Sequence, residues 1–162
     1  MRTALIVYYS RTGTTKTLAT ALADKLNADL AEIRCRRYGH GIFRYLRAGY
    51  DSVRGNLPPI DMPQTAMQTY DLVLLGAPIW TSHPALPLRA FLAGAPALPA
   101  RVALFLTYGG HSSPDIAIRE TEALLPGPLE ACLSLRSPDV EGAGLSSAVD
   151  AFAEKLIRQD SS

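Results

Sequence analysis

The chain has 162 residues, of which 48% are hydrophobic and 19% are charged. This composition is that of an ordinary folded domain and excludes a disordered, collagen-like or coiled-coil chain. We expect one domain over residues 1–162, because a chain of this length buries a sizeable core by itself. Its apolar runs are far shorter than the roughly 20 residues that cross a bilayer, and no signal peptide is visible. We therefore expect a cytoplasmic protein with no integral membrane association.

The formal net charge of +1, from 16 basic and 15 acidic residues, argues against nucleic acid as a partner. Within this balance six arginines gather between Arg34 and Arg54. Three interpretations of this arginine cluster stay open: a solvated edge, a docking patch for an acidic protein or an anionic membrane surface, and a site for the 2′-phosphate of NADPH. Because Cys35 and Cys132 have no CxxC spacing, the sequence indicates neither a metal site nor a disulfide scaffold.

Short apolar runs alternate with segments of helical period, a pattern typical of a parallel sheet with helices on both faces. The runs predict strands at Thr3–Tyr9, Asp29–Cys35, Tyr70–Gly76, Arg101–Tyr108 and Pro128–Leu135. The periodic segments predict helices at Thr15–Leu26, Pro84–Leu92, Asp115–Leu125 and Leu145–Ile157. Asn27 is placed to end the first helix. Ser113 is placed to cap the third, with Pro114 at its first helical position.

One connection, residues 36–69, is much longer than a single helix requires. It contains a short amphipathic piece, Ile42–Arg47, followed by the proline-containing segment Leu57–Pro63. A connection this long with little regular structure is usually functional or mobile.

The loop after the first strand reads Ser10-Arg11-Thr12-Gly13-Thr14-Thr15-Lys16. It surrounds one glycine with four hydroxyls at the start of a helix, whereas a helix cap needs only one. Such a loop turns N–H groups and hydroxyls toward one point at the positive end of the helix dipole and predicts a phosphate site. The loop lacks the second glycine of a Walker A motif and the three glycines of a dinucleotide fingerprint. It also lacks the nucleophilic cysteine of low-molecular-weight phosphatases.

Three motifs resemble the flavodoxin family. Tyr9–Thr15, YSRTGTT, resembles the loop that binds the FMN phosphate. Gly76–Trp80, GAPIW, followed by Thr81–Pro84, resembles the segment beside the isoalloxazine ring, and Thr107–His111, TYGGH, resembles the segment that closes its other side. The resemblance implies a single-domain flavodoxin-like α/β fold. Its doubly wound, five-stranded parallel sheet would have the order 2-1-3-4-5, with helices on both faces.

The resemblance also implies the site residues. The expected cofactor-binding residues are Ser10, Arg11, Thr12, Gly13, Thr14 and Thr15 at the FMN phosphate, and Pro78, Ile79, Trp80, Thr81, Thr107, Tyr108, Gly109 and Gly110 around the ring. His83 and His111 fall on the two ring segments and are the expected catalytic residues, stabilising negative charge on the ring or relaying a proton. Alternatively, they are capping or surface histidines. No metal is expected.

The family contains both electron carriers and FMN-dependent reductases, and two features favour a reductase. Carriers are generally strongly acidic, whereas this chain has a net charge of +1. The stretch Ile79–Pro84 contains no glycine, so a peptide at positive φ beside the ring is expected to cost about 1 kcal/mol more. That cost would favour two-electron chemistry.

We therefore expect an FMN-dependent NAD(P)H oxidoreductase that passes electrons to a quinone, a flavin or a similar acceptor. A non-enzymatic electron carrier and a flavin-free phosphoester-binding module stay open as alternatives. The expected partner is a redox protein or a small-molecule electron acceptor. The apolar side of Ile42–Arg47 is expected to form either a homodimer contact or a lid over the flavin.

Overall fold

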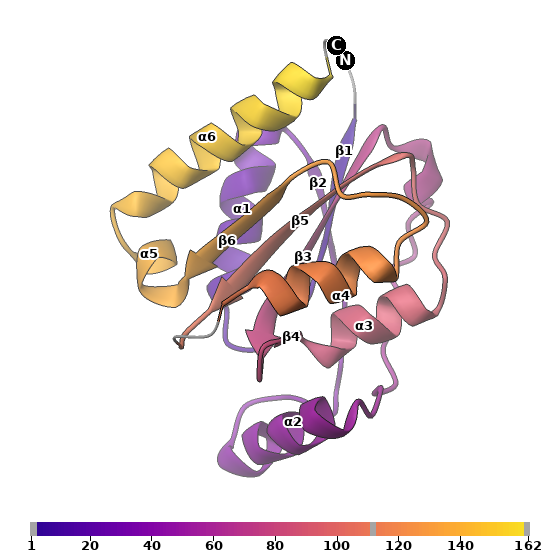
Figure 1. The fold of residues 1–162 in the computed structure, drawn as a ribbon, viewed down its shortest axis with the longest axis vertical. Coiled ribbons are helices and arrows are strands. Elements are labelled where there is room, and N and C mark those ends of the chain that lie inside the picture. Colours follow the sequence, from indigo (N-terminus) through magenta and orange to yellow (C-terminus); the bar gives the residue numbers. More distant parts are fainter. Residues whose placement is uncertain (1–2, 111–112, 161–162) are drawn as a thin grey trace.

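The computed structural model describes residues 3–110 and 113–160 and is built around a parallel β-sheet (Figure 1). The parallel strands are β1 (Ala4–Tyr8), β2 (Asp29–Glu32), β3 (Leu72–Trp80), β5 (Arg101–Tyr108) and β6 (Cys132–Arg136). They lie side by side in the order β2-β1-β3-β5-β6. This confirms the predicted order 2-1-3-4-5, since the additional short strand β4 (His83–Pro84) only pairs antiparallel with the end of β3.

Different helices cover the two faces of the sheet (Figure 1). On one face pack α1 (Thr14–Leu26) and α6 (Gly144–Gln159), and on the other pack α3 (Leu86–Ala93) and α4 (Asp115–Ala123). The short helix α5 (Ser137–Glu141) connects β6 to α6. This layering is the doubly wound arrangement that the alternating pattern predicted.

The side chains of β1 show how one strand serves both layers. Leu5 and Val7 join the core beneath α3 and α4, whereas Ile6 and Tyr8 join the core beneath α1 and α6. Since successive side chains of a strand point to opposite faces, a strand between two helical layers is apolar at every position. This explains why the sequence of β1 is apolar without interruption.

The strand β3 extends beyond its predicted end. Gly76 was expected to end the strand, but Ala77 and Pro78 continue the parallel pairing with Leu106 and Thr107 of β5. The segment predicted as a loop beside the ring is therefore a strand that leads into the hairpin with β4. By contrast, β2 is shorter than predicted and ends at Glu32.

The long connection is more regular than expected, because it contains a helix of 13 residues, α2 (Ile42–Arg54). This helix begins after Gly41, at φ 114°, and ends at Gly55, at φ 69°. It lies beyond the carboxyl ends of the strands, apart from both helical layers (Figure 1). A 3₁₀ turn, η1 (Met67–Thr69), precedes β3. The predicted piece was too short because Gly49 and Asp51 weaken the local helix signal.

The helix ends test two expectations about capping. Asn27 ends α1 as predicted, in the left-handed region at φ 51°, with its N–H donating to Ala23 O. The cap residue of α4 is Pro114 rather than Ser113, so the proline precedes the first helical position. The Ser113 hydroxyl still accepts from the Asp115 N–H, at 3.3 Å. Within the described ranges, the structure has no helix whose length and apolar content would let it span a bilayer.

Candidate functional site

A cavity of about 790 Å³ lies at the carboxyl ends of the parallel strands, bounded on one side by α2. Ligands bind at this edge in open α/β sheets, and the volume is within the usual range for small-molecule sites. The predicted cofactor residues that line the cavity are Arg11, Thr12, Thr14, Thr15, Pro78, Ile79, Trp80, Thr81, Thr107, Tyr108, Gly109 and Gly110. The fold thus brings the three motifs together around one space. The two other predicted residues, Ser10 and Gly13, do not belong to this lining and are hydrogen-bonded to each other within the loop.

The loop between β1 and α1 is arranged as an anion cradle. The Ser10 hydroxyl accepts from the Gly13 N–H at 3.1 Å and from the Lys16 N–H at 3.2 Å. Gly13 is the cap residue of α1, at φ 104°, and supplies no side-chain cap. The N–H groups of Thr14 and Thr15 in the first turn are therefore left for a ligand. The positive end of the helix dipole favours an anionic one.

Two threonine hydroxyls join the start of α1 to the end of β5. Thr15 Oγ1 lies 2.8 Å from Thr107 Oγ1, and both residues are buried while still lining the cavity. Whichever hydroxyl donates to the other, the accepting hydroxyl keeps its own O–H to offer a ligand. The pair therefore presents one fixed donor between the anion cradle and the strand ends.

The side chain of Trp80 is held by the edges of two tyrosine rings. Tyr9 and Tyr38 contact it in T-shaped geometry, with ring centroids 5.7 and 5.3 Å from that of the indole. The Tyr9 hydroxyl donates to the Tyr38 carbonyl oxygen at 3.1 Å. Burial raises the pKa of both tyrosines well above the ordinary value, so both phenols stay protonated. Trp80 is therefore both a packed residue and a fixed part of the cavity wall.

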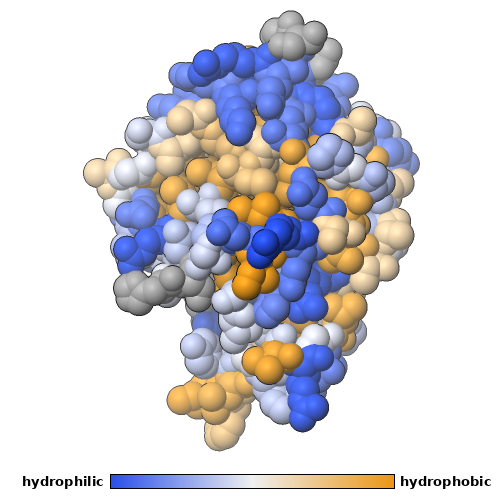
Figure 2. Space-filling view, in the orientation of Figure 1, coloured by the Kyte–Doolittle hydropathy of each residue, from blue (hydrophilic) through white to orange (hydrophobic). Residues whose placement is uncertain are grey.

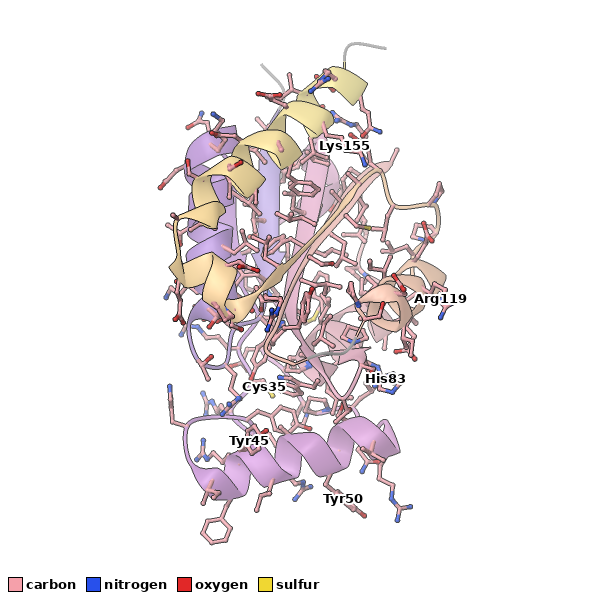
Figure 3. All side chains as sticks on the ribbon, turned by 60° about the vertical axis from the view of Figure 1, so that its left-hand side comes forward. Cys35, Tyr45, Tyr50, His83, Arg119 and Lys155 are labelled. Carbon is pink, nitrogen blue, oxygen red and sulfur yellow. The ribbon has the colours of Figure 1, made fainter. Side chains whose placement is uncertain are left out.

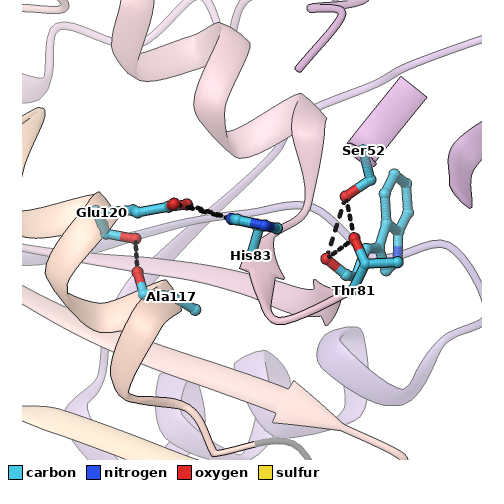
Figure 4. Close-up of polar contacts among 7 residues, drawn as sticks. Ser52, Thr81, His83, Ala117 and Glu120 are labelled. Carbon is cyan, nitrogen blue, oxygen red and sulfur yellow. Dashed lines mark hydrogen bonds and ion pairs between the residues drawn. The ribbon is translucent and has the colours of Figure 1, made fainter. Parts of the chain in front are cut away.

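The hairpin between β3 and β4 turns through two non-glycine residues with positive φ. Thr81 and Ser82 both have positive φ, 50° and 70°, the geometry of the tight turns that match the twist of a hairpin. The absence of glycine was expected to make such a backbone cost about 1 kcal/mol more, and the turn adopts it without glycine. The turn is supported by the Ser52 hydroxyl, which donates to the Trp80 carbonyl oxygen at 3.1 Å and lies 2.8 Å from Thr81 Oγ1 (Figure 4).

His83 is not among the described residues that line the cavity. His83, in β4, has its Nδ1 at 2.8 and 2.9 Å from the two carboxylate oxygens of Glu120 in α4 (Figure 4). It lies outside the cavity lining and ties the hairpin to α4. His111 lies outside the described residues.

The sequence analysis missed most of the wall formed by α2. The residues of α2 that line the cavity are Tyr45, Leu46, Ala48, Gly49, Tyr50 and Val53, and Ser137 of α5 joins them. The Arg11 guanidinium lies over the Tyr45 ring, 5.2 Å from its centroid, and so links the anion cradle to this wall. In Figure 3, α2 crosses the end of the molecule as a separate layer below the sheet. The apolar stripe could have been followed past Arg47, since Leu46, Tyr50 and Val53 continue it at helical spacing.

Part of the arginine cluster compensates a buried carboxylate. Asp51 is fully buried, with Arg47 Nε 2.9 Å and Arg37 Nη1 3.7 Å from its Oδ2. Burial raises the pKa of Asp51, but hydrogen bonds from Tyr38, Arg47 and Asn56 lower it more, so its net pKa is below the ordinary value. The presence of Arg37 and Arg47 in the cluster is therefore explained by the structure, since a buried carboxylate needs positively charged partners.

No family model and no curated protein matches this chain, but solved structures do. A flavoprotein in complex with FMN from Lactobacillus acidophilus NCFM is 24% identical, with a TM-score of 0.71 over 94% of this chain and 99% of that one. A flavodoxin, WrbA-like protein from Agrobacterium tumefaciens is 15% identical, with a TM-score of 0.61 over 98% and 99% of the two chains. An azoreductase from Bacillus anthracis str. Sterne is 13% identical, with a TM-score of 0.57 over 95% and 100%. The chain therefore has the flavodoxin-like α/β fold.

Proposed function

We propose that the chain binds FMN in this cavity and acts as an FMN-dependent NAD(P)H oxidoreductase, passing electrons to a quinone, a flavin or a similar acceptor. The observation that carries the proposal is one cavity with an anion cradle at one end and apolar walls at the other. FMN has the same two parts, a phosphate and a planar ring. Three structural neighbours support this assignment: a flavoprotein in complex with FMN, a WrbA-like flavodoxin and an azoreductase.

The phosphate end fits a dianion through backbone N–H groups and hydroxyls. The N–H groups of Thr14 and Thr15 stand at the start of α1, and the Thr12 side chain lines the same end. Ser10 keeps the loop in place by accepting from two of its N–H groups. Because Gly13 holds φ 104°, the loop can turn into the helix directly beneath the ligand.

The ring end fits a planar aromatic group. We assign one wall to Pro78, Ile79, Trp80 and Thr81 of the β3–β4 hairpin. The opposite wall is assigned to Thr107, Tyr108, Gly109 and Gly110, where the glycines let backbone N–H groups come close to a ring edge. Apolar walls with a few fixed donors are the usual lining of a flavin-sized site.

When bound, FMN supplies hydride acceptance and electron transfer to a second substrate. The residues of the chain hold the phosphate, orient the ring and limit the access of water. The Thr15–Thr107 pair holds one O–H beside the cavity. A proton-transfer role for His83 would require the β4 hairpin to leave Glu120, and His111 remains the other proposed donor.

The wall formed by α2 favours an enzyme over an electron carrier. A carrier exchanges electrons with protein partners through an exposed edge of the flavin ring. In this chain α2 covers one side of the cavity, and its residues Leu46 and Val53 line the cavity. The space suits small molecules, such as a nicotinamide and an aromatic acceptor. The near-neutral net charge of +1 also gives no steering toward a basic protein partner.

The test is spectroscopic and then kinetic. The purified protein is incubated with excess FMN, desalted and examined for flavin absorbance, with riboflavin as the control that lacks the phosphate. We expect a yellow protein with clear preference for FMN. Anaerobic titration with NADH and with NADPH should bleach the flavin, and either nucleotide should be consumed steadily with a quinone acceptor. A colourless protein refutes the proposal, and bleaching by dithionite but by neither nucleotide identifies a carrier instead.

A further inference from the structure

Helix α2 has few apolar contacts with the rest of the molecule. Its buried residues are Ala48, Asp51 and Ser52, whereas Ile42, Phe43 and Val53 are at least 70% exposed. Hydrophobic side chains are correspondingly visible at the lower end of the molecule, over α2, in Figure 2. The position of this helix therefore depends on polar contacts, because it buries little apolar surface.

The first of these contacts is a network around the Asp51 carboxylate. It accepts from the Tyr38 hydroxyl at 2.7 Å, from Arg47 Nε at 2.9 Å and from Asn56 Nδ2 at 3.3 Å. Tyr38 belongs to the segment after β2 and packs edge-on against the Trp80 indole. Asp51 thus connects α2, through one tyrosine, to the ring of Trp80 in the wall formed by the β3–β4 hairpin.

The second contact is made by the next residue, Ser52. Its hydroxyl donates to the Trp80 carbonyl oxygen and lies 2.8 Å from Thr81 Oγ1. Two consecutive residues of α2 therefore reach Trp80 from two directions. Asp51 acts on the indole through Tyr38, and Ser52 acts directly on the backbone.

We propose that Asp51 and Ser52 are positioning residues that fix α2 and Trp80 relative to each other, so that the cavity is formed before its ligand binds. A buried carboxylate is a poor way to gain stability, because well-packed apolar residues usually serve as well or better. Directed hydrogen bonds, however, select one geometry, which apolar contacts on an exposed helix do not. The identity of the ligand rests on the proposed function, whereas the positioning does not.

The first experiment uses ligand-free protein and needs no flavin. Asp51→Asn and Ser52→Ala are compared with Asp150→Asn, which alters an exposed carboxylate of α6 that pairs with Lys25. Trp80 is the only tryptophan of the chain, so its fluorescence reports on the site alone. We expect red-shifted Trp80 emission in both test variants. Hydrogen exchange of the α2 amides should accelerate about tenfold, clearly more than that of the β1, β3 and β5 amides.

The second experiment measures FMN and riboflavin binding to the same variants. We expect both ligands to bind about tenfold more weakly to Asp51→Asn and Ser52→Ala, because the wall beside the ring is affected and the phosphate cradle is not. The ratio of the two affinities should stay at its wild-type value. Asp150→Asn should match the wild type throughout. If wild-type protein binds no FMN, the proposed function fails while the ligand-free experiment still decides the positioning role.

Two results would overturn the inference. In the first, Asp51→Asn and Ser52→Ala have the same α2 exchange rates and the same Trp80 emission as the wild type. The other is equal acceleration of α2 and central-strand amides, which would show a general loss of stability. Should Asp51→Asn fail to fold, Ser52→Ala and Tyr38→Phe decide the question by the same measurements. Tyr38→Phe keeps the ring beside Trp80 and removes only the hydroxyl that donates to Asp51.

Discussion

Replacing Gly76 by alanine places a methyl group where the core has no room. Gly76 lies within β3, paired with Tyr8 of β1 and Phe105 of β5. A Cβ at this position would lie 2.0 Å from Phe105 Cζ and 2.3 Å from Cε2. Ordinary contact begins at 3.4 Å, so the ring or the strand must move by about 1.4 Å. Phe105 is fully buried and close-packed, which leaves the ring little freedom to do so.

The expected effect is a loss of about 2–3 kcal/mol in the free energy of unfolding, the upper part of the range for overpacked cores. A domain of this size has about 5–15 kcal/mol in total, so Gly76→Ala should still fold. Because the strand continues from Gly76 to Trp80, a displaced strand also moves one wall of the cavity. FMN binding should weaken together with stability.

Urea denaturation followed by circular dichroism measures the effect, with a double-mutant cycle as the control. Phe105→Leu is chosen because it removes the ring atoms nearest to the new methyl group. By itself this substitution should cost about 1–2 kcal/mol through lost packing. The double variant should be at least about 1 kcal/mol more stable than the sum of the two losses predicts. Additive losses, or a Gly76→Ala variant within about 0.5 kcal/mol of the wild type, would refute the reasoning.

Other perturbations test the cradle, the buried charge and the far end of the sheet. Gly13→Ala has open space for its methyl group but strains a backbone at φ 104°, so it should weaken FMN about fivefold and leave riboflavin unchanged in fluorescence titrations. The lowered pKa of Asp51 stabilises the fold above the ordinary carboxyl pKa, and this contribution disappears as the pH falls through the lowered value. Urea titrations from pH 7 to about 2.5 should therefore show the wild-type advantage over Asp51→Asn shrinking below about pH 4, and a constant difference would contradict the assignment. Arg101→Ala should cost about 1–3 kcal/mol, because the side chain joins β5 to Glu130 and to Asp160 after α6, and a thermal shift under about 2 °C would argue against it.

The sequence by itself determined the alternation of strands and helices, and the resemblance to flavodoxins implied the order of the strands in the sheet. Apolar runs and helical periods are local patterns, so they can be recognised in the sequence directly. The hydroxyl-rich loop from Ser10 to Thr15 was recognisable because an anion cradle is made by consecutive residues. Parallel strands then bring the carboxyl ends of β3 and β5 to the same edge, where most of the predicted residues line one cavity.

Only the tertiary structure decided how that edge is closed and what its side chains do. Helix α2 contacts the rest of the site through Asp51, which accepts from Tyr38, and Ser52, which donates to Trp80, and no local pattern records these contacts. The turn at Thr81 adopts positive φ against its local preference, because a hydroxyl from a distant helix supports it. His83 is directed to Glu120 for the same reason: a side chain's partner is set by packing between elements, and spacing along the chain does not contain that information.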